Sequence, residues 1–149
     1  MKKNGTAVSV ICLGMFLQLW LFSLPAGLDH DVLKYTNQFR KSEGLNPLVD
    51  KKELDDIARR HSEDMAKGRT GFGHGGFNDR FSRARRSLKD IRTFAENVAY
   101  GVSTGKAVVE MWEHSPGHRR NLLGNFRYVG IGTASSRRGI IYYTEVFAK

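Results

Sequence analysis

The sequence predicts an α+β domain, in which helices cover a small sheet with antiparallel connections. Three observations lead to this fold class. Segments with helical periodicity come first in the chain, segments typical of strands lie mostly toward the carboxyl end, and short polar turns join them. The chain has 149 residues, without an internal repeat or a low-complexity tract, which is enough for one hydrophobic core.

The first two elements of this domain are predicted to be helices. Leu28–Ser42 contains apolar residues at helical spacing, and Gly44 ends it. The second helix is expected to begin at Asp50–Glu53, which is similar to a capping box, and to end at Gly68. Its core-facing stripe consists of Leu54, Ile57, Ala58, His61 and Met65. Because His61 belongs to this stripe, we expect a packed histidine there and not a ligand.

A glycine-rich loop and two further elements follow. The loop, Gly71–Gly76, carries His74. Asn78–Leu88 is predicted to be a third, basic helix, and Thr93–Tyr100 is predicted to be a strand that holds Glu96.

The next helix is expected to start at Ser103 or Thr104 and to end at Ser115, because Pro116-Gly117 breaks helices. Its predicted apolar side consists of Val108, Val109, Met111 and Trp112. A short helical turn over His118–Leu123 is expected beyond the break. The sequence therefore displays a histidine just past the end of a helix.

The last two elements are predicted to be strands, Tyr128–Ala134 and Ile140–Phe147, joined by the polar turn Ser135–Gly139. Gly130 and Gly132 fall on one face of the first of these strands. With no side chains at these positions, another element can pack close against the strand backbone.

The amino terminus is predicted to lie outside this domain. Lys2 and Lys3 precede an apolar run from Ala7 to Leu24, and small residues follow the run. This order is typical of a secretory signal peptide, residues 1–26, although the run is also long enough to stay as a membrane anchor. Both alternatives place the domain, residues 28–149, outside the cytoplasm, because the two lysines hold the terminus inside.

The only cysteine of the chain, Cys12, lies inside that apolar run. The predicted domain therefore has no disulfide, no thiolate metal site and no cysteine nucleophile. Its stability is expected to come from packing alone.

The positive charge of the chain, formally +9, is concentrated in one short segment. The cations of this segment are Arg80, Arg83, Arg85, Arg86, Lys89 and Arg92. The first four can attract an anionic surface such as lipid headgroups or cell-wall polymers, whereas a solvated helix face is the simpler interpretation. Nucleic acid is not expected as a partner, since no aromatic side chains alternate with these arginines.

These segments together resemble the CAP superfamily of cysteine-rich secretory proteins, antigen 5 and plant pathogenesis-related class 1 proteins, and in particular its short, disulfide-free bacterial branch. The motifs that carry the resemblance include A-R-R-H-S-E-D-M-A at Ala58–Ala66, D-R-F at Asp79–Phe81, A-E-N-V-A-Y-G at Ala95–Gly101, W-E-H-S-P-G-H-R-R-N-L-L at Trp112–Leu123 and Y-Y-T-E-V-F at Tyr142–Phe147. The resemblance covers Leu28–Lys149. It implies a three-layer α-β-α sandwich with a small, mainly antiparallel sheet, secretion, and a cleft with two histidines and two acids.

The resemblance assigns the positions of this cleft residue by residue. His74 matches the first histidine of the family, Glu96 its first glutamate and His118 its second histidine. Ser115 stands where eukaryotic members have the second glutamate, as the bacterial branch often has it. The candidate ligand-binding residues are therefore His74, Glu96, Ser115 and His118, and no residue is assigned a catalytic role.

Two interpretations of the cleft chemistry are open. The two imidazoles and the carboxylate of His74, His118 and Glu96 are suitable ligands for zinc or a similar divalent ion, which three protein ligands would bind weakly. Alternatively, the cleft is a hydrogen-bonded polar site in which Glu96 orients the two histidines.

The sequence gives little support to an enzyme, since it contains neither H-E-x-x-H nor G-x-S-x-G. We therefore expect a secreted or surface-tethered, non-enzymatic module that binds a lipid, a cell-envelope component or a protein partner through the cleft. The alternative is a metal-assisted or serine-type hydrolase, in which Ser115 would be the nucleophile, His118 the base and Glu96 the orienting group. The oligomeric state is not predicted.

Overall fold

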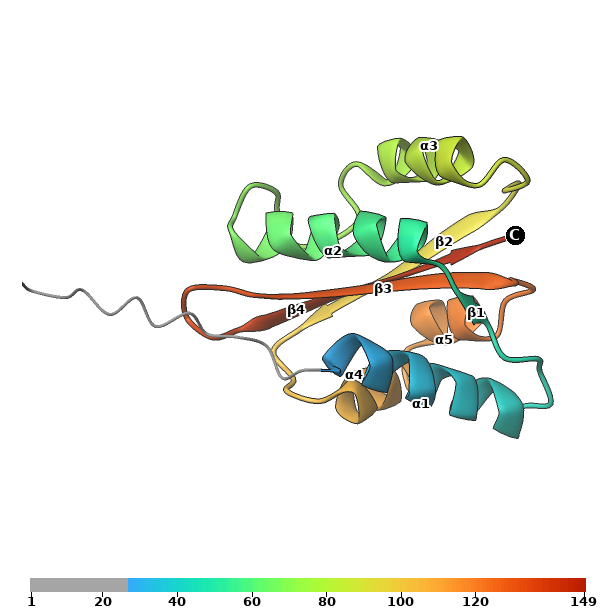
Figure 1. Cartoon of the computed structure of the whole chain (residues 1–149). Helices are drawn as coiled ribbons and strands as arrows, with labels where there is room; N and C mark the ends of the chain where they lie inside the picture. Colours follow the sequence, from blue (N-terminus) through green and yellow to red (C-terminus); the bar gives the residue numbers. More distant parts are fainter. Residues whose placement is uncertain (1–26) are drawn as a thin grey trace, which may run out of the picture.

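The computed structural model of the chain describes residues 27–149, and Figure 1 shows its arrangement. The elements are α1 (Leu28–Ser42), β1 (Val49–Asp50), α2 (Lys52–Ala66), α3 (Phe77–Ser87), β2 (Phe94–Tyr100), α4 (Gly105–Glu113), α5 (Pro116–Leu122), β3 (Tyr128–Ser135) and β4 (Ile141–Ala148). The predicted signal or anchor lies outside the described residues. Within them, no helix has both the length and the apolar character needed to cross a bilayer.

The sheet lies between two layers of helices, which confirms the predicted α-β-α sandwich. Figure 1 shows α2 and α3 on one face of the sheet and α1, α4 and α5 on the other. The strand order is β1-β3-β4-β2, so β4 is central and β2 forms an edge. β4 is antiparallel to both of its neighbours, whereas the two-residue β1 runs parallel to β3 and makes the sheet mixed. This short strand was not predicted, because two residues are too few to show a periodicity.

The predicted start of the second helix is wrong, whereas the predicted break at Pro116 is confirmed. Asp50 belongs to β1, and α2 starts after Lys51 without a side-chain cap, so the capping box does not form. The helix before Pro116 ends as predicted, and the predicted short helical turn is α5, which begins at Pro116 and holds His118 in its first turn. A proline fits this position because the amide of a first helical residue has no partner within the helix.

Each face of the sheet has its own hydrophobic core. On the side of α1, α4 and α5 the largest buried side chains are Trp112, Tyr143 and Phe147, all of them fully buried. The apolar side predicted for α4 is wrong at Met111, which is 40% exposed. The opposite core contains Leu54, Ile57 and Ala58 of the predicted α2 stripe, packed with Val146 and Ala148 of β4.

The close packing expected at Gly130 and Gly132 is confirmed. A Cβ atom at Gly130 would overlap the backbone of Leu54, and one at Gly132 would overlap the backbone of Arg59. Helix α2 therefore lies directly on β3 at these two glycines, and this contact fixes the helix that carries His61.

Glu145 is an ionisable residue that is buried on β4 and faces α1. Its Oε1 accepts a hydrogen bond of 2.8 Å from the Thr36 hydroxyl, and its Oε2 has no partner among the described residues. Burial raises the pKa of Glu145 to about 8. The carboxyl group is therefore protonated at neutral pH.

This burial predicts a pH-dependent stability. The unfolded chain releases the Glu145 proton near pH 4.5 and the folded protein holds it to about pH 8, so the stabilisation is complete at low pH and is lost as pH rises. This one group lowers the free energy of unfolding by at most about 1.4 kcal/mol per pH unit. Glu145→Gln keeps the neutral shape and should abolish this decrease in urea denaturation.

The comparison is best made above about pH 6, because burial also raises the pKa of Asp55 to about 6. Exposed Glu53→Gln is the matched control and should keep the wild-type slope. A slope that Glu145→Gln leaves unchanged would show that Glu145 is charged in the folded protein.

Candidate functional site

Glu96 is the centre of the site. It lies on the edge strand β2 and is 4% exposed. Arg80 of α3 donates two hydrogen bonds to its carboxylate, from Nε to Oε2 at 2.6 Å and from Nη2 to Oε1 at 2.7 Å. His74 donates from Nδ1 to Oε1 at 2.8 Å. A two-pronged arginine pair of this kind fixes both the position and the orientation of a carboxylate.

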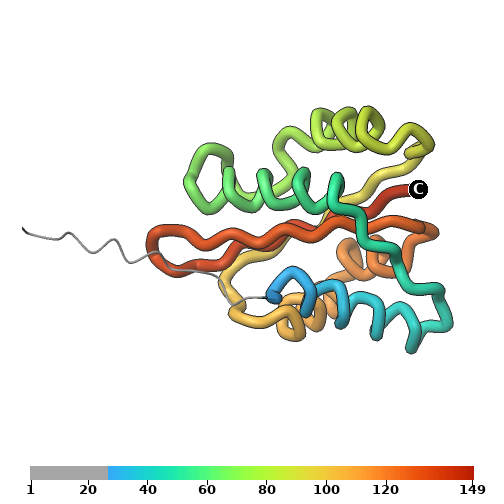
Figure 2. The backbone as a smooth tube through the Cα atoms, in the orientation of Figure 1, coloured from blue at the N-terminus to red at the C-terminus, as the bar shows by residue number. Residues whose placement is uncertain are grey.

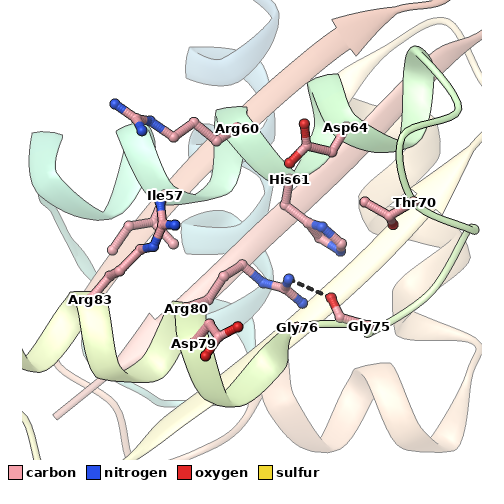
Figure 3. Close-up of a pocket in the computed structure, with 10 residues that line it drawn as sticks. All are labelled: Ile57, Arg60, His61, Asp64, Thr70, Gly75, Gly76, Asp79, Arg80 and Arg83. Carbon is pink, nitrogen blue, oxygen red and sulfur yellow. Dashed lines mark hydrogen bonds between the residues drawn. The ribbon is translucent and has the colours of Figure 1, made fainter.

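The glycine-rich loop is held against the helices by two side chains. His61 of α2 donates from Nε2 to the Gly73 carbonyl at 2.8 Å, and Arg80 donates from Nη1 to the Gly75 carbonyl at 2.7 Å. Figure 3 shows both side chains pointing toward the loop from their two helices, along the wall of a pocket of about 270 Å³. The prediction that His61 is packed is confirmed, since it is 3% exposed. Burial lowers the pKa of His61, so it is neutral at pH 7.

His74 is exposed to solvent, and one of its two ring nitrogens is hydrogen-bonded to Glu96. Its side chain is 51% exposed. Because Nδ1 carries the proton that Glu96 accepts, the neutral ring has its lone pair on Nε2. This nitrogen can accept a hydrogen bond, take a proton or bind a metal ion.

His118 approaches the same strand from α5. Its Nδ1 is buried without a partner among the described residues, and its ring lies 6.4 Å from the Trp112 ring. Burial, together with the nearby His74, lowers the pKa of His118, and the ring is neutral at pH 7. No hydrogen bond within residues 27–149 joins His118 to His74 or Glu96, so the interaction between the two histidines is electrostatic.

Strand alternation explains how one edge strand serves both groups of residues. Glu96 faces α2 and α3, and Asn97 faces α5, because successive side chains point to opposite faces. Asn97 donates to the His118 carbonyl at 3.3 Å. Asn121 of α5 donates to the Glu96 carbonyl at 3.1 Å and to Asn97 Oδ1 at 2.9 Å. The site therefore spans the edge of the sheet, and both asparagines were missed in the sequence.

Ser115 occupies the N-cap position of α5, but its side chain makes no capping hydrogen bond. None of the hydrogen bonds of residues 27–149 joins the Ser115 hydroxyl to His118. Its role as a ligand-binding residue stays a prediction.

Arg80 and the predicted metal ion would bind the same carboxylate, that of Glu96. Within residues 27–149, no group of three or more His, Cys, Asp or Glu side chains is arranged to hold a metal ion. Both oxygens of the buried Glu96 carboxylate accept hydrogen bonds from Arg80, which neutralises the charge that would attract a zinc ion. His74 Nε2 and the imidazole of His118 are the groups that could hold the ion, and zinc binding stays a prediction.

Arg80 also changes the predicted basic surface. It is 9% exposed and belongs to the Glu96 site, whereas Arg83, Arg85 and Arg86 are exposed on α3. Its place on the helix was a signal that could have identified it, because Arg80 lies four residues before the buried Ala84 and so shares the inward face of α3.

The chain is similar to proteins of a known family. The model of the family described as "Cysteine-rich secretory protein family", or CAP, matches residues 33–147. The Bacillus subtilis protein YkwD, described as uncharacterized, is 35% identical over 130 residues, which are 85% of this chain and 49% of YkwD.

Several solved structures are also similar to this chain. The chain is similar to an extracellular protein containing a SCP domain from Bacillus anthracis, with 28% identity, a TM-score of 0.71 and coverage of 83% of this chain and 40% of that one. An outer surface protein from Borrelia burgdorferi has a TM-score of 0.70, at 22% identity, and is covered over 89% of its length by 79% of this chain. The chain spans about half of YkwD and less than half of the Bacillus anthracis protein.

Proposed function

The chain belongs to the CAP family of cysteine-rich secretory proteins, and on this basis we propose that it is an exported, non-enzymatic module that binds a lipid, a cell-envelope component or a protein partner. The binding site consists of His74, Glu96, Ser115 and His118. The extracellular and outer-surface descriptions of its relatives support a secreted or surface-tethered location. The basic, apolar amino-terminal segment supports the same location.

One observation carries the proposal. Glu96 is buried and fully hydrogen-bonded to Arg80 and His74, so it acts as a fixed support and not as a group that changes partners. The groups left to a ligand are the exposed Nε2 of His74 and the imidazole of His118. A histidine such as His74, whose ring is fixed by a buried carboxylate, favours recognition of a hydrogen-bonding ligand.

The alternative function, a hydrolase, is favoured by the same His74. A histidine whose Nδ1 is held by a carboxylate has the orientation of a general base at Nε2. The serine-type version lacks support, because the described residues contain no hydrogen bond between Ser115 and a histidine. For the metal-assisted version, calorimetric titration of zinc into wild type and His74→Ala is the test. Zinc binding that is equally tight in wild type and in His74→Ala would place the metal elsewhere.

The proposal predicts binding without turnover. Isolated bacterial cell walls, uncharged lipid vesicles and a pool of envelope proteins should be incubated separately with the protein and then pelleted or captured. We expect one of the three to retain it, and His74→Gln or His118→Gln to weaken that retention by about tenfold, which corresponds to roughly 1.4 kcal/mol.

His114→Gln is the matched control, because His114 is an exposed histidine at the end of α4 and should bind as wild type. Retention that neither site variant changes would contradict the proposed site. Release of soluble fragments from the cell walls, abolished by His74→Gln, would identify the hydrolase instead.

A further inference from the structure

A cluster of exposed aromatic side chains lies at one end of the sheet, beside the loop that carries His74. The exposed large hydrophobic residues of the described chain are Val49, Phe72, Tyr100 and Met111. Phe72 and Tyr100 contact each other, with ring centroids 4.7 Å apart, and Tyr100 stacks on Tyr142 at 5.6 Å. We call Phe72, Tyr100 and Tyr142 the aromatic cluster. Phe72 and Tyr100 are each about half exposed, and neither belongs to a hydrophobic core of the described residues.

The aromatic cluster continues into a groove with a basic rim. This groove has a volume of about 740 Å³, and its walls include Met65, Ile140 and Tyr142 together with the cations Lys67, Arg137 and Arg138. Arg137 and Arg138 are exposed in the turn between β3 and β4 and make no ion pair within residues 27–149. Lys67 is paired with Glu63. Two guanidinium groups are therefore left to attract an anionic partner.

The apolar run of the amino terminus joins the domain at this same end. Asp29, in the first turn of α1, accepts a hydrogen bond of 2.7 Å from Thr133, two residues before the end of β3. Figure 2 shows the turn between β3 and β4 and the end of α2 on the side toward which α1 begins. Only residues 25–27 separate the run, Ala7–Leu24, from α1, and three residues span at most roughly 10 Å. A membrane that holds the run is therefore close to the aromatic cluster.

We propose that the aromatic cluster and the Arg137–Arg138 turn form a membrane-docking face, which rests on an anionic lipid bilayer where the amino-terminal run enters it. Aromatic side chains with an apolar body and a polar edge are favoured at the headgroup level of a bilayer. Arginines at an anionic surface each strengthen binding by roughly fivefold. This proposal goes beyond the proposed function, because it does not use the His74–Glu96 site.

The basic segment of α3 fits a bilayer less well. Arg85 and Arg86 are exposed, but the neighbouring Phe81 is partly buried and stacks on Phe94 at 5.4 Å. Figure 1 shows α3 toward the other end of the sheet from the turn between β3 and β4. Helix α3 therefore offers positive charge, but it has no exposed aromatic cluster, and the start of α1, where the amino-terminal run joins the domain, is not beside it.

The test uses the domain from Gly27 onward, because residues within 28–148 supply both hydrophobic cores of the described chain. Vesicles of equal parts phosphatidylglycerol and phosphatidylcholine are pelleted with the domain, and pure phosphatidylcholine vesicles serve as the uncharged reference. We expect binding to the anionic vesicles that falls with added salt. Arg137→Ala/Arg138→Ala should weaken it by roughly twentyfold to thirtyfold.

The chain offers a matched control for each half of the face. Arg85→Ala/Arg86→Ala removes an equal pair of adjacent arginines from α3 and should bind as wild type. Phe72→Ser/Tyr100→Ser should weaken binding about tenfold or more, whereas Val49→Ser/Met111→Ser, which removes the other two exposed hydrophobic side chains, should not.

Several results would overturn the proposal. These are the absence of vesicle binding, equal losses from the two arginine pairs, equal losses from the two hydrophobic pairs, or binding to cell walls alone. His114→Gln, an exposed histidine at the end of α4 outside both the site and the membrane-docking face, should leave binding to the anionic vesicles unchanged. The membrane-docking face and the proposed function can fail independently.

Discussion

Arg80→Met is expected to lower the free energy of unfolding by about 3–5 kcal/mol, because it leaves the buried carboxylate of Glu96 without its two-pronged partner. The variant also removes the hydrogen bond that holds the Gly75 carbonyl and therefore loosens the loop that carries His74. Urea denaturation followed by circular dichroism measures the loss.

Two further variants separate charge pairing from packing. Arg80→Met/Glu96→Gln removes the unpaired charge together with its partner and should recover most of the loss. Arg83→Met, on an exposed position of α3, should change the free energy of unfolding by less than about 0.5 kcal/mol. If Arg80→Met were no worse than Arg83→Met, Glu96 would not depend on Arg80.

Trp112→Ala is expected to cost about 3–5 kcal/mol of the free energy of unfolding. The indole is fully buried between α4 and the sheet, its Nε1 donates to the Val98 carbonyl at 3.4 Å, and its ring lies beside His118. Truncation removes a large apolar area from the core and leaves a cavity there. Thermal and urea unfolding of the two proteins give the difference.

Met111 supplies the matched control for this prediction. It neighbours Trp112 on α4 but is 40% exposed, so Met111→Ala should cost less than about 1 kcal/mol. Trp112→Phe retains most of the apolar volume and covers the case in which the alanine variant does not fold. A loss from Trp112→Ala no larger than that from Met111→Ala would show that the indole is dispensable to the core.

Regular patterns in the sequence were sufficient to predict most of the fold. The stripe of α2 repeats at steps of three and four residues, and each of its five members is buried. Paired glycines on one face of a strand predicted a close neighbour, and α2 lies there. The contact between His74 and Glu96 joins two of the cleft positions that the resemblance to a family assigned, whereas His118 makes no hydrogen bond to either.

The features that were not predicted depend on contacts between distant segments. Arg80 lies on the buried face of a basic helix, and nothing local indicates that its partner is Glu96 on the next strand. Asn97 and Asn121 acquire their roles only because α5 packs on the edge strand. Met111 is apolar yet exposed, since periodicity gives the direction of a side chain and not the presence of a neighbour to cover it.

The central position of β4 has a consequence for the timing of folding. β4 pairs with both β2 and β3, but it is made after every other described element, so the sheet cannot assemble until residues 141–148 have been synthesised. Contacts between segments far apart in a chain also form slowly. A polypeptide that is threaded through a secretion channel must stay extended during its passage. The order of strands in this domain delays completion of the sheet until β4 has been synthesised, which suits the export proposed above.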